Sequence, residues 1–244
     1  MIAPSGIRGG IAFDAGPGPG VNDPAGAGGA VGFRDASAED VVAPDAAPSD
    51  LLVVPGNPPP VPGYLGRPWN NTPQVIPGAI QCAHFDLGGE GVAYHDTDMI
   101  DEGIALGGGP AGGLRPGEGV DVGFALPSLD HSITPTPIQP GQSYVGWTHP
   151  GEWVRYTLTV SLAGRYFISA MMSASADGSL VSFSFEDGAT TGPRPLPSTK
   201  DVHIWQGVPA IGFVDLTAGT HVLTVKFEAV ATDSLAFLAF ARQP

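Results

Sequence analysis

Two stretches of this 244-residue chain concentrate side chains that could take part in binding or catalysis. One stretch contains Gly88-Gly89-Glu90-Gly91-Val92-Ala93-Tyr94-His95-Asp96-Thr97 and then Glu118-Gly119-Val120-Asp121-Val122. The other is Val145-Gly146-Trp147-Thr148-His149-Pro150-Gly151-Glu152-Trp153. Carboxylates can serve as acids, bases or hydrogen-bond acceptors, and flat indole rings can pack on the apolar face of a sugar. Hydrolysis of glycosides and binding of sugars are therefore the two chemistries to weigh.

Catalysis is the weaker of the two. Glycoside hydrolysis needs an acid and a second carboxylate that face each other across a cleft. The available carboxylates are candidates by residue type only, and turns or exposed loops explain them more simply: Glu90, Asp96, Glu118, Asp121 and Glu152. No Gly-x-Ser-x-Gly motif is present, and the histidines lack the spacing of a zinc site. We therefore predict no enzyme and no metal site.

Composition divides the chain into two parts. Residues 1–78 contain 28 Gly or Pro residues and only four aromatic ones, so they can bury too little apolar surface to offset the loss of backbone entropy. We predict a Gly/Pro-rich extended arm or linker over residues 1–78. Residues 79–244 hold the remaining aromatic residues, and we expect them to form one folded domain.

The folded part has the pattern of an all-β protein. Apolar and polar residues alternate over several short runs separated by turn residues, which predicts half-buried strands at 153–160, 165–170, 180–186, 221–227 and 234–241. No segment has a convincing helical stripe. We therefore predict an antiparallel β-sandwich of the jelly-roll type, interrupted by long loops at 99–113 and 125–143.

Charge and apolar content exclude several classes of partner. The formal net charge is −14 and no basic cluster occurs, which argues against nucleic-acid binding. No run of about 18 apolar residues could insert into a membrane, and no signal peptide is visible. Cys82 is the single cysteine, so no intrachain disulfide can form, and we expect a buried thiol there.

The motifs at 88–97, 118–122 and 145–153 resemble those of the family 6 carbohydrate-binding modules, over about residues 76–240. Those modules are β-sandwiches that bind sugars without cleaving them. The resemblance implies a lectin-like module that binds polysaccharide or glycan by aromatic stacking. It also implies a location outside the cell or on the surface of an assembly.

One family site lies in the loops at the end of the sandwich, where two rings clamp a sugar and an Asn binds its hydroxyl groups. By resemblance, the first ring falls on Trp147, the second on Val202 and the Asn on Ser234. Only one ring remains of two, and a shorter hydroxyl replaces the amide. Loss of a stacking partner would weaken binding there by roughly 1–3 kcal/mol.

A second family site lies on the concave face of a sheet, where the family tryptophan falls on Trp153. We expect Tyr94 and His95 near it and Arg155 on the same face of the strand, although Trp153 could equally be a core residue. Trp205 enters an apolar strand and is expected in the core.

The structural calcium of the family is expected to be absent. Two positions that supply carboxylates in family members fall on Ala83 and Ala236 here. Calcium requires six to eight oxygen ligands, so we predict neither calcium nor another cofactor.

Two functions from different classes fit these observations. The first is a non-catalytic carbohydrate-binding module displayed on the N-terminal arm. The second is a structural or decoration protein of a virion, filament or surface layer, which keeps the sandwich and is anchored to other subunits through the arm. Short apolar segments such as 51–54 could dock the arm on such a partner.

Overall fold

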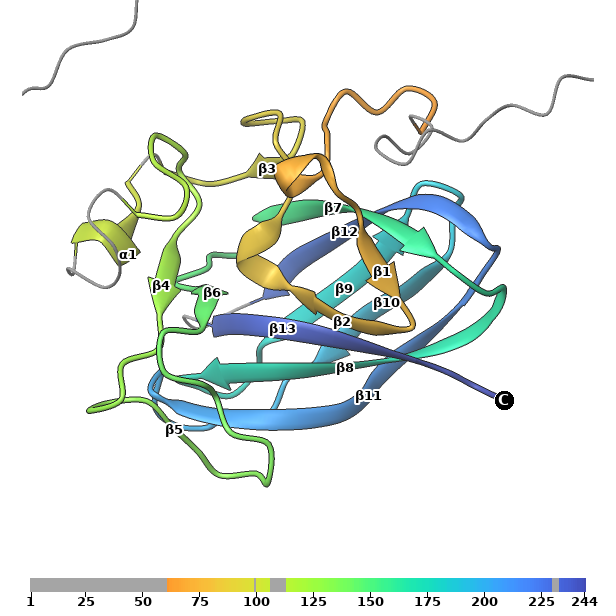
Figure 1. Cartoon of the computed structure of the whole chain (residues 1–244). Coiled ribbons are helices and arrows are strands. Elements are labelled where there is room, and N and C mark those ends of the chain that lie inside the picture. Colours follow the sequence, from red (N-terminus) through yellow and green to blue (C-terminus); the bar gives the residue numbers. More distant parts are fainter. Residues whose placement is uncertain (1–60, 99, 106–112, 230–232) are drawn as a thin grey trace, which may run out of the picture. The chain divides into compact units, whose positions relative to one another are not determined.

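The computed structural model describes residues 61–98, 100–105, 113–229 and 233–244 (Figure 1). Most of the predicted arm, including its apolar segments up to 51–54, lies outside the described residues. The strands are β1 (Gln74–Ile76), β2 (Gly78–Gln81), β3 (Tyr94–His95), β4 (Val122–Phe124), β5 (His131–Ser132), β6 (Ser143–Val145), β7 (Trp153–Val160), β8 (Gly164–Ala174), β9 (Leu180–Phe185), β10 (Thr190–Pro195), β11 (Ile204–Leu216), β12 (Gly219–Ala229) and β13 (Asp233–Arg242). The helices are α1 (Glu102–Ala105) and the 3-10 turns η1 (Trp69–Asn71) and η2 (Cys82–His84).

The strands form two sheets that face each other across a core. The first sheet has the order β1-β7-β12-β9-β10, with β3 also paired to β7. The second has the order β4-β6-β13-β8-β11-β5, with β2 also paired to β13. The pairs β1–β7 and β5–β11 are parallel, whereas the long central pairs are antiparallel. The predicted β-sandwich is confirmed.

Alternation along β7 shows how the sequence builds this fold. Val154, Tyr156 and Leu158 are at most 3% exposed and belong to the core between the sheets, whereas Trp153 and Arg155 lie on the outer face and are half-buried. Successive side chains of a strand point to opposite faces. Each large apolar side chain that becomes fully buried contributes about 1.5–3 kcal/mol.

The described residues before position 79 pack on the sandwich. Ile76 is fully buried in the core, and β1 pairs with β7 from Gln74↔Leu158 onward. Further upstream, the Tyr64 hydroxyl donates a hydrogen bond to Asp86 Oδ2 at 2.9 Å. The boundary that composition placed at 78/79 therefore falls inside the folded part of the chain.

The loop predicted at 125–143 packs on the outer face of the second sheet. It contributes to a second, smaller core made of Ala125, Ile138, Tyr144, Met171, Trp205 and Ala236. Trp205 is fully buried there, as expected, and its Nε1–H donates to Asp130 Oδ1 at 2.7 Å. The Pro-rich loop thus gives the second sheet a partial third layer. Of the other long loop, 99–113, several residues lie outside the described part.

Two further expectations concern Cys82 and the membrane. Cys82 is buried, and burial raises the pKa of its thiol to about 12, so it behaves as a small apolar side chain. No helix among the described residues has the length and apolar character needed to cross a membrane.

Candidate functional site

The predicted site residues lie in two separate places. Trp153 and His95 are cross-strand neighbours on β7 and β3, at the outer face of the first sheet, with their ring centres 6.3 Å apart. Trp147 lies instead beside the second, smaller core. The two family-like sites are therefore distinct surfaces with different environments.

Arg155 contacts both aromatic and polar groups on the outer face of the first sheet. Its guanidinium carbon lies 4.3 Å from the ring centre of Trp153 and 5.9 Å from that of Tyr64. Its Nε–H donates to Thr224 Oγ1 at 3.2 Å, and Nη1 donates to the carbonyl of Val92 at 3.0 Å. These contacts hold the guanidinium between two aromatic rings.

A groove of about 280 Å³ adjoins Arg155. The segment 61–64 forms one side, and strands β7, β12 and β9 form the floor, with lining residues Val61, Pro62, Gly63, Tyr64, Arg155, Ser184, Phe185, Glu186, Val222 and Thr224. Cross-strand pairing explains the floor, because Arg155 lies opposite Thr224 and Thr224 opposite Ser184. The groove therefore presents a cation, hydroxyl groups, a carboxylate and an aromatic ring together. Ligand sites in proteins are concave and hold a few convergent polar groups, so this groove is a candidate site.

Tyr94 does not line this groove. It is 6% exposed, packs edge-on against Phe85 at 5.8 Å and accepts a hydrogen bond from the Gly119 N–H at 3.4 Å. Burial is the main reason that the pKa of its hydroxyl is raised. Tyr94 lies opposite Val154 in the β3–β7 pair and faces the core, whereas His95 lies opposite Trp153 and faces out.

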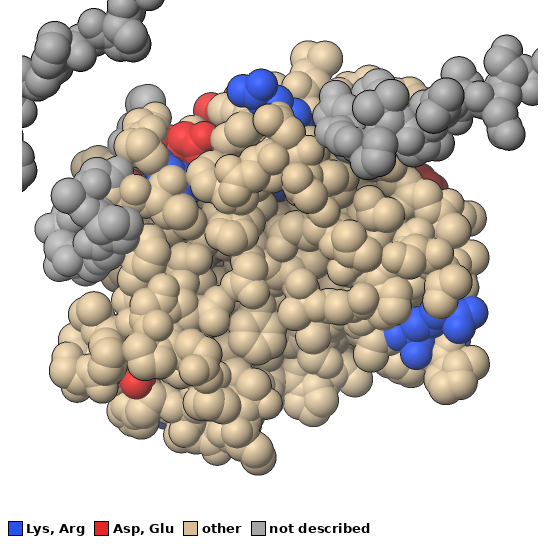
Figure 2. Space-filling view, in the orientation of Figure 1, with Lys and Arg blue, Asp and Glu red and all other residues tan. Residues whose placement is uncertain are grey.

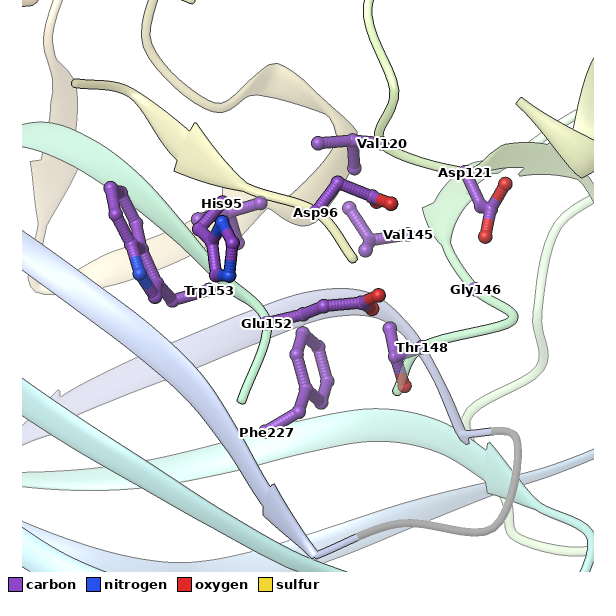
Figure 3. Close-up of a pocket in the computed structure, with 11 residues that line it drawn as sticks. His95, Asp96, Val120, Asp121, Val145, Gly146, Thr148, Glu152, Trp153 and Phe227 are labelled. Atoms are coloured by element: carbon purple, nitrogen blue, oxygen red, sulfur yellow. The ribbon is translucent and has the colours of Figure 1, made fainter. Parts of the chain in front are cut away.

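Three carboxylates gather behind Trp153 and His95, around a cavity of about 10 Å³ (Figure 3). Glu152 Oε1 accepts hydrogen bonds from the N–H and hydroxyl of Thr97, and Asp121 Oδ1 accepts one from the Glu102 N–H. Burial, opposed by a backbone hydrogen bond and reinforced by neighbouring carboxylates, raises the pKa of Asp96 to about 6 and that of Asp121 to about 8.

These carboxylates accept hydrogen bonds that hold neighbouring loops together, and they do not face a substrate cleft. A cavity of that size holds about one water molecule, so no sugar can enter between them. Glu90 has a similar role, because its Oε1 lies 2.6 Å from His95 Nδ1 and its Oε2 accepts the Asp96 N–H. Over the described residues, no group of three or more His, Cys, Asp or Glu side chains is arranged to hold a metal ion.

Trp147 is half-buried against protein side chains. Its ring stacks on Tyr144 at 5.8 Å and 27°, and Tyr144 in turn packs against Trp205 at 4.9 Å. One face of the Trp147 ring is therefore already occupied, so a sugar would have only the other face.

Ser234 and Val202 lie near Trp147 but add little binding chemistry. Ser234 is 4% exposed, and a Cβ atom added to Gly146 would lie 2.9 Å from its Oγ. Ser234 pairs with Ser173 across β13 and β8, and the Ser173 hydroxyl donates to the Val202 carbonyl at 2.8 Å. The structure thus places Ser234 next to Gly146 and, through Ser173, near Val202; of the three family positions only Trp147 supplies a ring.

The two positions of the expected calcium site are apolar and buried. Ala83 and Ala236 are both fully buried, and neither side chain carries an oxygen. The nearby Gln81 Oε1 accepts a hydrogen bond from the Gln142 side-chain amide. The Gln142 amide, from the 125–143 loop, thus occupies the Gln81 oxygen. The absence of calcium stays a prediction.

The outer face of the second sheet contains a second groove, of about 370 Å³, between the 134–136 segment and strands β8, β11 and β13. No ionisable side chain lines it; apolar residues such as Met171 and Phe237 dominate, with hydroxyls at its rim. Figure 2 shows mostly uncharged side chains over these strands. Two apolar residues of the adjoining loop are exposed, Leu129 by 48% and Ile133 by 60%.

Comparison with known proteins finds a family match over part of the chain. Residues 129–240 match the carbohydrate binding module family 6. The resemblance to family 6 is confirmed. Members of family 6 are non-catalytic binding modules. The matched region includes Trp147, Trp153 and the strands that carry Arg155, Thr224 and Ser184.

The comparison with solved structures matches several family 6 modules. A module from Clostridium stercorarium in complex with cellobiose is 12% identical, covering 70% of this chain and 98% of its own, with a TM-score of 0.45. A β-1,3-glucan-binding module from Bacillus halodurans is 14% identical, covering 69% and 98%, with a TM-score of 0.44. The module of Cellvibrio mixtus lichenase 5A, in complex with cellotriose, is 20% identical, covering 47% and 86%, with a TM-score of 0.39. No curated protein matches the chain.

Proposed function

We propose that this protein binds polysaccharide or glycan without cleaving it, on the outer face of the first sheet. The observation that carries the proposal is the half-buried ring of Trp153 on the outer face of the sheet beside a polar groove. A sugar ring has apolar faces and a polar rim, so it needs an aromatic surface with hydroxyl, amide or charged groups next to it. Such a role suits a location outside cells or on the surface of an assembly, where polysaccharides are found.

This face is a better candidate than the loops around Trp147. Each ring has one face covered, Trp147 by Tyr144 and Trp153 by the Arg155 guanidinium, but Ser234, the hydroxyl residue near Trp147, is buried. In contrast, Thr224 and Ser184 line an open groove together with Arg155. A ligand on the first sheet would therefore find more hydrogen-bonding partners than one at the end of the sandwich.

Binding to a panel of soluble and insoluble polysaccharides tests the proposal. Trp153→Ala should weaken binding by about tenfold or more, as expected of an aromatic anchor, with little change in melting temperature. Phe213→Ala is the matched control, since Phe213 is a 45% exposed ring on the second sheet. Equal losses in both variants, or unchanged binding in Trp153→Ala, would contradict the assignment.

The uncharged groove on the second sheet favours the structural alternative. Apolar lining next to the exposed Leu129 and Ile133 is typical of a surface that another protein covers. Under this alternative the full chain assembles with other subunits, and Ile133→Ser weakens the assembly. Light scattering of the full chain and of this variant, alongside the polysaccharide panel, separates the two functions.

A further inference from the structure

We propose that the groove on the first sheet selects acidic saccharides, with the Arg155 guanidinium pairing with a carboxylate on the sugar. This inference rests on the proposed function, because it assigns a ligand class to the same groove. It predicts uronic acid units in the polysaccharide that the protein binds.

The bonding of Arg155 is the first reason. Both of its hydrogen bonds go to neutral acceptors, the Thr224 hydroxyl and the Val92 carbonyl. A guanidinium has five N–H donors in a planar fork that matches a carboxylate, so two bonds leave donors for a ligand. Among the described residues Arg155 has no carboxylate partner, which it shares with Arg67, Arg194 and Arg242, whereas Arg115, Arg165, Lys200 and Lys226 each form an ion pair.

The setting of the charge is the second reason. Arg155 is half-buried between the rings of Trp153 and Tyr64 and lines the groove directly. A charge that is partly withdrawn from water interacts more strongly with an opposite charge than an exposed one does. Of the described arginines without an ion pair, Arg155 is the one that lines this groove beside two aromatic rings.

The other charged groups around the groove allow an anion beside Arg155. Glu186 lies on the far side, since it follows β9, which is separated from β7 by β12 and thus by about 9.5 Å. Its Oε2 accepts the Val222 N–H at 2.6 Å, and its Oε1 lies 3.4 Å from His221 Nδ1. The cross-strand neighbour of Trp153, Lys226, is paired with Glu228 at 2.7 Å.

The carboxyl group of Asp86, which reaches this side of the sheet, is already occupied. It accepts hydrogen bonds from the Tyr64 hydroxyl at 2.9 Å and from both the N–H and the hydroxyl of Thr157. The groove therefore has a cationic side at Arg155 and an anionic side at Glu186. A uronic acid unit would place its carboxylate at Arg155 beside the Trp153 ring and its hydroxyl groups toward Ser184 and Glu186.

The test compares polygalacturonate with its methyl-esterified, uncharged form, and dextran sulfate with dextran, by titration calorimetry. Wild type should bind polygalacturonate at least about tenfold more tightly than the ester. Arg155→Gln should remove about 10- to 100-fold of the affinity for polygalacturonate, the worth of a charge-assisted hydrogen bond, and should abolish the preference for polygalacturonate over the ester. Arg165→Gln is the matched control, because that exposed arginine is paired with Asp215 on the other sheet.

A second variant keeps the proposal testable even if Arg155→Gln does not fold. Glu186→Gln retains an acceptor for the Val222 N–H and removes the negative charge from the groove, so it should strengthen binding of polygalacturonate. Binding of neutral and acidic forms with equal affinity would overturn the inference and leave the proposed function intact. A preference for dextran sulfate that depends on Arg155 would overturn the carboxylate assignment in favour of a sulfate ester. Failure to bind any saccharide would refute the proposed function itself.

Discussion

Replacement of Asp121 by Asn should stabilise the folded domain at alkaline pH and have little effect at acid pH. Asp121 is 6% exposed, and its Oδ1 accepts the Glu102 N–H at 2.6 Å. Burial first, and then the charges of Asp96, Glu102 and Asp101, raise its pKa from the ordinary 3.8 to about 8. Asn keeps an acceptor oxygen without the charge, so the substitution isolates the electrostatic effect.

The sign follows from proton binding. Between the unfolded and folded pKa values of Asp121, the folded state holds a proton that the unfolded chain has released. The stabilisation is complete below the unfolded pKa and is lost as pH rises through the folded pKa. Asp96 and Asp233, whose pKa values rise to about 6, act in the same direction. His84 acts in the opposite direction, because burial and Arg115 lower its pKa.

The magnitude comes from the width of that window. Each pH unit between the unfolded and folded pKa values of Asp121 lowers the free energy of unfolding by about 1.4 kcal/mol. The shift from 3.8 to about 8 therefore corresponds to an upper bound of about 6 kcal/mol at alkaline pH. Relaxation of the loops and water entry reduce such penalties. We therefore expect Asp121→Asn to gain about 2–3 kcal/mol in the free energy of unfolding at alkaline pH.

Urea unfolding from about pH 4.5 to about pH 8.5 measures this difference, with EDTA present so that no divalent cation neutralises the carboxylates. Wild type, Asp121→Asn and Asp215→Asn are compared; Asp215 is an exposed carboxylate whose pKa is lowered by Arg165. Only Asp121→Asn should gain stability, and the gain should grow with pH. A gain that is the same at every pH, or a loss at alkaline pH, would refute the electrostatic reasoning.

Three further predictions concern the aromatic residue of the loops, the start of the domain and the family asparagine position. Trp147→Ala should lower the free energy of unfolding by about 2–4 kcal/mol, because the ring packs on the second, smaller core; an unchanged melting temperature would return Trp147 to the role of a ligand-binding ring. A chain that starts at Val61 should unfold at a higher urea concentration than one that starts at Val75, which lacks the contacts of segment 61–74 with the sandwich; equal midpoints would make those contacts negligible. Ser234→Asn should destabilise the fold by about 1–3 kcal/mol, since its site is buried beside Gly146; tighter sugar binding without loss of stability would contradict this expectation.

The sequence predicts the sandwich well because alternation is a local signal. The runs at 153–160, 180–186 and 221–227 correspond to β7, β9 and β12, which lie side by side in the first sheet. In such strands one face must be buried, so the order of apolar and polar residues determines which side chains face the core. The same rule places Trp153 and Arg155 on the outer face.

The position of Tyr94 could not be predicted in the same way. The strand β3 contains only Tyr94 and His95, and two residues are too few to reveal a period of two. The motif predicts both residues near Trp153, and both pair with β7. A one-residue difference in register decides which of the two side chains faces out. Long-range pairing, not local pattern, places His95 outside and Tyr94 in the core.

The 125–143 loop gives no local signal for its packing. Its Pro-rich sequence has no periodicity, so nothing in it predicts that Ile138 and Tyr144 enclose Trp205 on the second sheet. The one local indication is Trp205 itself, a large apolar side chain that another segment must cover if it is to be buried. Which face of the sheet that cover occupies is a property of the tertiary structure.

The motifs that resemble those of family 6 build the scaffold of the candidate site more than its binding surface. Glu90 and Glu152 accept hydrogen bonds from the loop that contains Asp96 and Thr97, which explains why these residue types occur at these positions. The groove beside Trp153 depends instead on Arg155 and on Tyr64, and Tyr64 comes from a segment whose composition predicted no fold. Glu152 accepts two hydrogen bonds from Thr97 in the loop next to Trp153, whereas Arg155 and Tyr64 line the groove itself. We therefore expect the groove residues to determine ligand preference and the motif carboxylates to determine the conformation of the neighbouring loop.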